Sequence, residues 1–278
     1  MESFKEYIKD KRILLVGNSV EIMNYRKEVK LAKWIDNFDG VVVRFGKGLP
    51  EIKVQQKAVG TRTDVWVGGT FRLPMLYKES IRKLLTDSWV LFNKNRMYLD
   101  RMINPKEKKV IKLCQTNPKF INKKFEVMWT DKELIKIYKE FGYIPNKPEL
   151  PRPSTGFLTL LWFHRTYFRH YKQLNLIGFD FFAKSADAVR HEDTYAKPFS
   201  WHLPITKGAL PHLASVERSF AMFLEENKFI RWHKLSDLKE ESLKYSNYLK
   251  EKVWEKTEWE TPETIEKGGK LFVKGHKK

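Results

Sequence analysis

Two glycine-containing segments constrain the fold of this chain more than any other feature. In the first, residues 152–157 read R-P-S-T-G-F, and Pro153 fixes the backbone on the approach to a turn. Either Ser154 or Thr155 can cap a helix that begins there. The second segment, residues 175–180, reads N-L-I-G-F-D, an apolar run that ends at a glycine and is typical of a buried strand. The sequence therefore predicts a loop, a helix and a buried strand in that order.

The start of this helix has the chemistry of a phosphate site. The first N–H groups of a helix have no partner within the helix, and the hydroxyls of Ser154 and Thr155 add two more polar groups. Gly156 has no Cβ, so a ligand can approach the backbone closely. The alternative interpretation is a capped helix with no ligand in an ordinary α/β fold.

A second junction of the same type lies near the N-terminus. Residues 12–16 (R-I-L-L-V) form a short apolar run of strand type that ends in Gly17, Asn18 and Ser19. The segment matches neither the G-x-G-x-x-G fingerprint of dinucleotide sites nor a Walker loop. The side chains of Asn18 and Ser19 can hydrogen-bond a ribose or a phosphate, and residues 39–45 supply the next strand.

These junctions predict one α/β domain with a Rossmann-like, mostly parallel sheet and helices on both faces. We expect a nucleotide to lie across the carboxyl ends of the strands that end near Val16 and Phe45, against the helix that starts at Ser154. The domain is expected to span residues 1–236. Residues 237–278 are predicted to form a C-terminal amphipathic helix and a basic tail.

Five segments follow one another in the order and near the spacing of a known enzyme family. They are residues 16–19 with 41–45 (VGNS and VVVRF), 60–64 (GTRTD), 153–157 with 178–180 (PSTGF and GFD), 201–203 (WHL), and His212 with Glu217 (H-x-x-x-x-E). The first, third, fourth and fifth resemble the long, short, third and very short motifs of the eukaryotic-type sialyltransferases, glycosyltransferase family 29, and the second resembles the G-x-[KR]-T-[TD] segment that follows the long motif. The resemblance covers residues 12 to 232, and the ordered set is more specific than any single motif.

The resemblance implies a sheet of the GT-A-variant type and inverting transfer of a sugar from a CMP donor to a hydroxyl. It assigns His212 as the base, a role that suits an imidazole at neutral pH, and His202 as the group beside the leaving phosphate. Glu217 would orient the structure around the base; its alternative is a surface or capping carboxylate, and that of His202 is a structural histidine. The residues implied to hold the donor nucleotide are Gly17, Asn18, Ser19, Arg44, Ser154, Thr155 and Gly156.

The chain departs from the family pattern at three places. Animal members join the long and short motifs through paired cysteines, whereas Cys114 is the only cysteine here and no internal disulfide can form. Gly46 stands where a second asparagine usually ends the long motif. The third motif keeps His202 but lacks its usual aromatics, so the sugar and acceptor specificity of the family cannot be carried over.

Metal and other cofactors are not expected. Nucleotide-sugar enzymes that use a cation usually contain D-x-D, in which two carboxylates hold the metal on a diphosphate, and this chain has no D-x-D. A CMP-sugar carries a single phosphate and acts as a co-substrate. Zinc-ligand spacings and the G-x-S-x-G elbow of serine hydrolases are also absent from the sequence.

The net charge of +19 points to a polyanionic partner, of which nucleic acid is the most common. The alternative is a lysine-rich, solvated surface. Basic residues concentrate between residues 78 and 124, where Lys108 and Lys109 lie. Arg165, Arg169 and Lys172 recur at helical spacing and are predicted to form one basic stripe. We expect the aromatic residues between them to be core rather than stacking surfaces.

The sequence contains no transmembrane run or signal peptide and a single cysteine, which leads us to expect a cytoplasmic protein of a bacterial cell or a phage-infected host. The first hypothesis for the acceptor is a hydroxymethylated base, hydroxymethylcytosine, in phage DNA. The alternative acceptor is a bacterial surface glycan or glycolipid. A non-catalytic nucleic-acid-binding protein is a third class, against which the presence of both His212 and Glu217 argues. The sequence specifies neither the sugar nor the oligomeric state.

Overall fold

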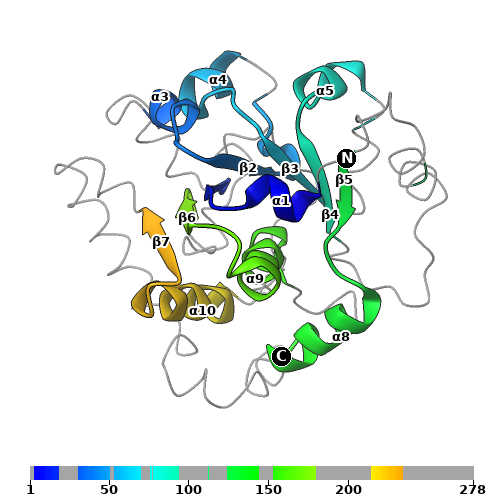
Figure 1. The fold of residues 1–278 in the computed structure, drawn as a ribbon, viewed down its shortest axis with the longest axis vertical. Helices are drawn as coiled ribbons and strands as arrows, with labels where there is room; N and C mark the ends of the chain where they lie inside the picture. Colours follow the sequence, from blue (N-terminus) through cyan, green and yellow to red (C-terminus); the bar gives the residue numbers. More distant parts are fainter. Residues whose placement is uncertain are drawn as a thin grey trace, which may run out of the picture.

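The computed structural model describes residues 3–18, 31–50, 53–69, 76, 78–93, 112, 124–143, 153–179 and 214–233. Its centre is a seven-stranded sheet in the order β5-β4-β3-β2-β1-β6-β7, in which every neighbouring pair is parallel (Figure 1). The strands are β1 (Arg12–Val16), β2 (Val41–Phe45), β3 (Val65–Gly69), β4 (Trp89–Asn93), β5 (Phe125–Val127), β6 (Gln173–Ile177) and β7 (Ile230–His233).

Helices cover both faces of this sheet. They are α1 (Phe4–Ile8), α3 (Leu31–Asp36), α4 (Lys53–Val59), α5 (Glu79–Leu84), α8 (Asp131–Glu140), α9 (Thr155–Tyr167) and α10 (Ala214–Glu226), with a short 3-10 turn, η1, at Gly46–Gly48. Helices α1, α8, α9 and α10 contribute to the core on one face, whereas α3, α4 and α5 pack on the other (Figure 1). Within the described ranges, no helix has both the length and the apolar character needed to cross a membrane.

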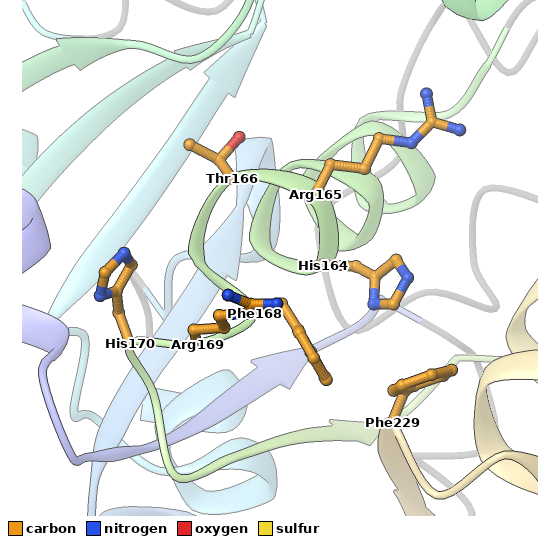
Figure 2. A pocket seen from close by; sticks show the side chains of 7 residues that line it. All are labelled: His164, Arg165, Thr166, Phe168, Arg169, His170 and Phe229. Carbon is orange, nitrogen blue, oxygen red and sulfur yellow. The ribbon is translucent and has the colours of Figure 1, made fainter.

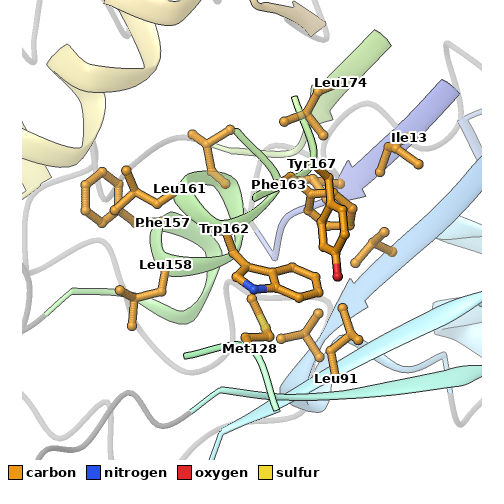
Figure 3. Packing of buried hydrophobic residues seen from close by; sticks show 14 of the residues in the cluster. Ile13, Leu91, Met128, Phe157, Leu158, Leu161, Trp162, Phe163, Tyr167 and Leu174 are labelled. Atoms are coloured by element: carbon orange, nitrogen blue, oxygen red, sulfur yellow. The ribbon is translucent and has the colours of Figure 1, made fainter. Parts of the chain in front are cut away.

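The central strands are apolar because they are buried on both faces. Along β1, Ile13 and Leu15 face one core, while Leu14 and Val16 face the other. The larger core surrounds α9, whose Trp162, Phe163 and Tyr167 pack among residues of the sheet (Figure 3). As expected from the sequence, these aromatic side chains are core, but the same expectation is wrong for Phe168, which is 43% exposed.

The strand order places a topological switch point between β1 and β6. From β1 the chain moves outward one strand at a time to β5, and then returns to pair β6 with the other side of β1. In open α/β sheets, ligands bind in the crevice outside the carboxyl ends of the strands at such a point. The structure confirms the predicted α/β, Rossmann-like fold. It also identifies the carboxyl ends of β1 and β6 as the place where a site is expected.

Glycine is required where β1 and β6 end. The N–H of Gly17 donates to the carbonyl of Ile177 at 2.8 Å, one residue beyond the last strand pair. A Cβ at Gly17 would lie 2.1 Å from the carbonyl oxygen of Gly178, which itself has a φ of +67°. The two backbones therefore stay in contact as they leave the sheet, and no side chain fits between them.

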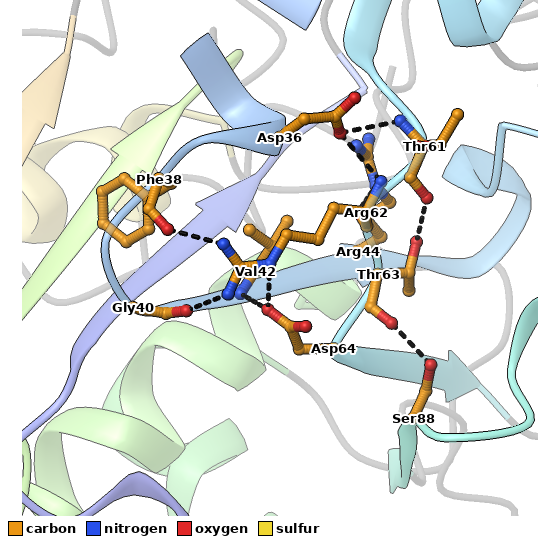
Figure 4. Close-up of polar contacts among 10 residues, drawn as sticks. All are labelled: Asp36, Phe38, Gly40, Val42, Arg44, Thr61, Arg62, Thr63, Asp64 and Ser88. Carbon is orange, nitrogen blue, oxygen red and sulfur yellow. Dashed lines mark hydrogen bonds and ion pairs between the residues drawn. The ribbon is translucent and has the colours of Figure 1, made fainter. Parts of the chain in front are cut away.

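The GTRTD segment precedes β3 and lies at the amino ends of the strands. The site expected at the switch point lies at their carboxyl ends. The carboxylate of Asp36 accepts hydrogen bonds from the N–H groups of Thr61 (2.8 Å) and Arg62 (2.9 Å) (Figure 4). Arg62 forms an ion pair with Asp64 at 2.9 Å, and Asp64 also accepts from the N–H of Val42 at 2.8 Å. This network ties the end of α3 and the starts of β2 and β3 together, so the contacts of this segment are structural.

Candidate functional site

Residues from three strands meet at the carboxyl edge of the sheet beside the switch point. After β1, the side-chain amide of Asn18 donates to the carbonyl of Phe45, the last residue of β2, at 3.4 Å. After β6, the ring of Phe179 packs edge-on against the ring of Phe45, with centroids 5.8 Å apart. The residues at the carboxyl ends of β1, β2 and β6 are therefore in contact with one another.

Helix α9 begins at the same surface. Ser154, one of the two residues proposed as the cap, is its N-cap, and the Ser154 Oγ accepts a hydrogen bond from the N–H of Phe157 at 3.1 Å. The partial positive charge of a helix N-terminus and its first N–H groups favour an anion at this place. The first turn of α9 contains no acidic residue of its own.

The ring of Phe179 occupies the space left by two glycines of this site. A Cβ at Gly156 would lie 2.8 Å from the Phe179 ring, and a Cβ at Gly17 would lie 2.9 Å from the same ring. The sequence led us to expect that Gly156 leaves room for a ligand. The structure places an aromatic ring there, so a phosphate at the start of α9 has to bind beside Phe179.

A fully buried carboxylate joins α10 to the start of α9. Glu217, in the first turn of α10, accepts hydrogen bonds from the N–H of Ser154 at 2.7 Å and from its Oγ at 2.6 Å. The hydroxyl of Tyr143 donates to the same carboxylate at 3.1 Å. Glu217 is thus not a surface carboxylate, and its contacts position the first residue of the predicted phosphate loop.

Burial raises the pKa of Glu217 to about 7, although its hydrogen bonds from Ser154 and Tyr143 act in the opposite direction. Near neutral pH this carboxyl group therefore changes its charge readily. The charge matters because an ionised Glu217 repels an anion bound at the start of α9. Protonation of Glu217 removes that repulsion.

Arg44 has a structural environment. Its side chain is fully buried, and the guanidinium donates to the carbonyl of Arg62 at 2.8 Å and to that of Val59 at 2.6 Å. These contacts tie β2 to the segment between α4 and β3. The resemblance implies that Arg44 contacts the donor nucleotide, which would require the guanidinium to leave these carbonyls.

Several predicted residues lie outside the described part of the chain. They are Ser19, Lys108, Lys109, His202, His212 and the segment 237–278. In the sequence, His212 precedes the first residue of α10 by two positions. The roles proposed for these residues stay predictions.

The predicted basic stripe on one helix is wrong. Helix α9 ends at Tyr167, and Arg169 and Lys172 lie in the turns that lead to β6. The helix ends there because the backbone pairs with the connection between α1 and β1: the N–H of Lys172 donates to the Lys11 carbonyl at 2.8 Å. Arg165, the one member of the three on the helix, forms an ion pair with Glu140 of α8.

Two contributors to the site were not identified from the sequence. Phe179 follows Gly178 directly, and an aromatic residue after a strand-ending glycine is a weak signal that could have suggested it. Tyr143 is separated from Glu217 by 74 positions, and no sequence signal connects the two residues. The buried His233 ends β7, and its Nε2 lies 3.1 Å from the Oδ1 of Asn175.

Among the described residues, no group of three or more His, Cys, Asp and Glu side chains is arranged to hold a metal ion. Comparison with known protein families finds no family model that matches this chain, and comparison with curated proteins finds no match to its sequence. The functional interpretation therefore rests on the motif resemblance together with the residues at the switch point and their geometry.

Proposed function

We propose that this protein is an inverting, metal-independent glycosyltransferase that moves a sugar from a CMP-activated donor to a hydroxyl acceptor. One observation carries the proposal: three motif segments far apart in the sequence converge on the switch point of the sheet. Gly17 and Gly156 both contact the ring of Phe179, and Ser154, beside Gly156, is held by Glu217. Phosphate-bearing ligands bind at this place in open α/β sheets.

The donor phosphate would bind at the N-terminus of α9. The positive end of the helix dipole favours an anion, and the hydroxyl of Thr155 adds a polar group at the same turn. Glu217 holds the cap residue Ser154 in position through two hydrogen bonds. Asn18, on the neighbouring loop, would contact the ribose or the phosphate.

The chemical step would be a single displacement. As the acceptor oxygen bonds to the anomeric carbon, His212 takes the proton from the acceptor hydroxyl. The bond between the anomeric carbon and the phosphate oxygen breaks, and CMP leaves with its electron pair. His202 would stabilise the charge that develops on the phosphate. Attack opposite the leaving group inverts the configuration at the anomeric carbon. The roles of both histidines follow from the family resemblance.

The acceptor that the composition favours is DNA with a hydroxymethylated base. A net charge of +19 is unfavourable for an isolated protein and is relieved by a polyanion. If the base must leave the duplex to reach the donor, unstacking costs a few kcal/mol, which contacts with the phosphate backbone would offset. The family resemblance by itself favours a surface glycan or glycolipid as the acceptor.

Calorimetry of nucleotide binding tests the donor. We expect CMP to bind more tightly than UMP, UDP or GDP, because the proposal has one phosphate at the start of α9 and a cytosine as the base. Tighter binding of a uridine or guanosine nucleotide contradicts the proposal.

A transfer assay tests the acceptor. It offers the CMP-sugar donor with hydroxymethylcytosine DNA, with plain DNA, and with a lipo-oligosaccharide or capsule acceptor. Transfer only to the modified DNA supports the proposed acceptor. Transfer only to the glycan assigns the protein to the alternative.

A further inference from the structure

An open cavity of about 410 Å³ lies at the C-terminal end of α9, far from the proposed donor site. It is lined by His164, Arg165, Thr166, Phe168, Arg169, His170 and Phe229 (Figure 2). Its volume falls within the range of small-ligand pockets, which is roughly 300–1,000 Å³. The lining combines aromatic rings with cationic and imidazole groups and contains no acidic side chain.

The aromatic part of this cavity is open to solvent. Phe168 is 43% exposed, and its ring packs edge-on against that of Phe229, with centroids 5.2 Å apart. Phe229 in turn lies 5.1 Å from the ring of His164. Phe168 differs in this respect from the other aromatic residues of its segment, Trp162, Phe163 and Tyr167, which are buried. The ring of Phe168 is therefore held in place by Phe229 and still exposes surface that a ligand can contact.

The polar groups of the cavity favour an anion with hydrogen-bonding atoms. Arg169 is exposed and forms no ion pair with any residue in the described ranges, whereas Arg165 is held by Glu140. In Figure 2 the side chain of Arg165 extends away from Phe168 and Phe229. The Nδ1 of His164 is buried and has no hydrogen-bond partner among the described residues. Burial, and secondarily the charge of Arg165, lowers the pKa of His164, so that its ring is neutral at pH 7.

We propose that this cavity binds one unpaired base and an adjoining phosphate of a single-stranded nucleic acid, with the base stacked on Phe168 and the phosphate on Arg169. Aromatic surfaces beside cations are the usual construction of single-strand sites, because every base has a face that can stack. An acidic peptide would satisfy Arg169 and leave the exposed ring without a partner. The inference extends the proposed function, since it assumes that the acceptor is DNA.

The cavity lies away from the proposed donor site, so its proposed role is to bind the strand and not to catalyse the transfer. The thirteen residues of α9 span roughly 20 Å, which separates the cavity from the cap residue Ser154. This length corresponds to about six nucleotides along one strand of B-form DNA. A strand held at Phe168 would thus be anchored several nucleotides from the reacting base, and the donor site would stay free for CMP.

Fluorescence anisotropy with a short labelled oligothymidine tests the proposal on the full chain. Phe168→Ala should weaken binding by about fivefold to 150-fold, the range measured for loss of one stacked base. Arg169→Gln should weaken binding and lower the slope of log affinity against log salt by about 0.7. The matched controls are Phe223→Ala, a phenylalanine outside the cavity that is 52% exposed, and Lys132→Gln, an exposed cation on α8. Both controls should bind like the wild type, and thermal unfolding verifies that all four variants fold.

Four results would overturn the proposal. The first is unchanged oligothymidine affinity in Phe168→Ala. The second is an equal loss of polyphosphate binding in that variant, since polyphosphate has no bases to stack. The third is competition by polyglutamate at the affinity of the oligonucleotide, which would assign the surface to an acidic protein. The fourth is equally tight binding of the mononucleotide dTMP, which would assign the cavity to a small ligand.

CMP calorimetry on the same variants separates this inference from the proposed function. Strand binding that depends on Phe168 in a protein without CMP affinity leaves the cavity assignment intact and rejects the glycosyltransferase. Specific CMP binding without any strand binding rejects the cavity assignment alone.

Discussion

At the residue scale, Glu217 is the side chain whose position says most about the site. A fully buried carboxylate is costly unless hydrogen bonds satisfy it, and here all of the described donors come from Ser154 and Tyr143. The same side chain therefore connects α10, α9 and the residue that follows α8. Removal of Glu217 would leave the Ser154 N–H without its acceptor, so the position tests both stability and donor binding.

The first prediction concerns the pH dependence of stability. Because the folded-state pKa of Glu217 is raised to about 7, the folded protein binds this proton more tightly than the unfolded chain does. The stabilisation is present in full below the unfolded pKa of about 4.5 and is lost as the pH rises to about 7. Relative to Glu217→Gln, the free energy of unfolding of the wild type should therefore fall over this range, by on the order of 3 kcal/mol. Urea denaturation across the range measures it, and parallel curves for the two proteins contradict it.

The second prediction concerns Gly17. In Gly17→Ala the new methyl group meets a backbone oxygen at 2.1 Å, and neither backbone can move without breaking the end of the sheet. We expect a loss of about 1–3 kcal/mol or more in the free energy of unfolding. Gly156→Ala is the matched control, because its methyl group meets only the edge of the Phe179 side chain, at 2.8 Å, and alanine is favoured in a helix. Equal losses in the two variants would show that the contact between the backbones of Gly17 and Gly178 has no special weight.

The third prediction concerns the proposed base. His212→Ala should reduce turnover by about 10²–10⁴-fold while CMP affinity is nearly kept, because the base acts on the acceptor and not on the nucleotide. His202→Ala should reduce both turnover and CMP affinity if His202 contacts the phosphate. Steady-state kinetics together with calorimetry distinguish the two patterns. Turnover like that of the wild type in His212→Ala removes this residue from the mechanism.

At the scale of helices and strands, the features that depend on neighbouring residues in the sequence could be predicted from it. The strand at 12–16, the strand expected at 39–45 and observed at 41–45, and a cap at Ser154 or Thr155 were predicted because apolar runs and capping residues act on their immediate neighbours. The end of α9 was not, because a backbone contact between Lys172 and Lys11 determines it. The spacing of the basic residues alone predicts a helix that extends through Arg169. In the structure, the chain has already turned toward β6 at this residue.

The candidate site, too, could be predicted only in the parts that short segments of the sequence determine. Its glycines and the cap could be proposed from short segments, and the switch point brings those segments together. The contact between Glu217 and Ser154 spans 63 positions, and the burial of Arg44 depends on carbonyls after α4. Both are tertiary effects that the identity of the residue does not reveal.

The fourth prediction concerns the network ahead of β3. Asp36→Ala removes the acceptor of two backbone N–H groups, and we expect a loss of about 1–3 kcal/mol in the free energy of unfolding. CMP affinity of the folded variant should be unchanged, because this network lies at the amino edge of the sheet and the proposed donor site at the carboxyl edge. Chemical denaturation and calorimetry on the same preparation measure the two quantities. Loss of CMP affinity in a fully folded variant would give the GTRTD segment a part in donor binding.

At the scale of the whole molecule, α9 connects the two proposed sites. Its N-terminus lies at the proposed donor site with Glu217, and its C-terminal end forms the cavity with Phe168 and Arg169. A long-range field from the net charge of +19 would bring a polyanion to the surface, and the cavity would hold one strand of it. The arrangement predicts that the sequence-independent and the stacking contributions to DNA affinity can be separated by salt.

The last prediction therefore concerns the salt dependence of binding to duplex DNA, which offers phosphates without free bases. Log affinity should fall with log salt at about −0.9 for each neutralised phosphate, so that several contacts make binding collapse between roughly 50 and 200 mM salt. Arg169→Glu should flatten this slope, because Arg169 is exposed and forms no ion pair with a described residue. Arg165→Glu should flatten the slope less, since Arg165 is already paired with Glu140, but it should reduce stability by placing two carboxylates together. CMP affinity should be unaffected in both variants. A shallow slope in the wild type would mean that the positive charge is a solvated lysine-rich surface, and the glycan acceptor would then be favoured.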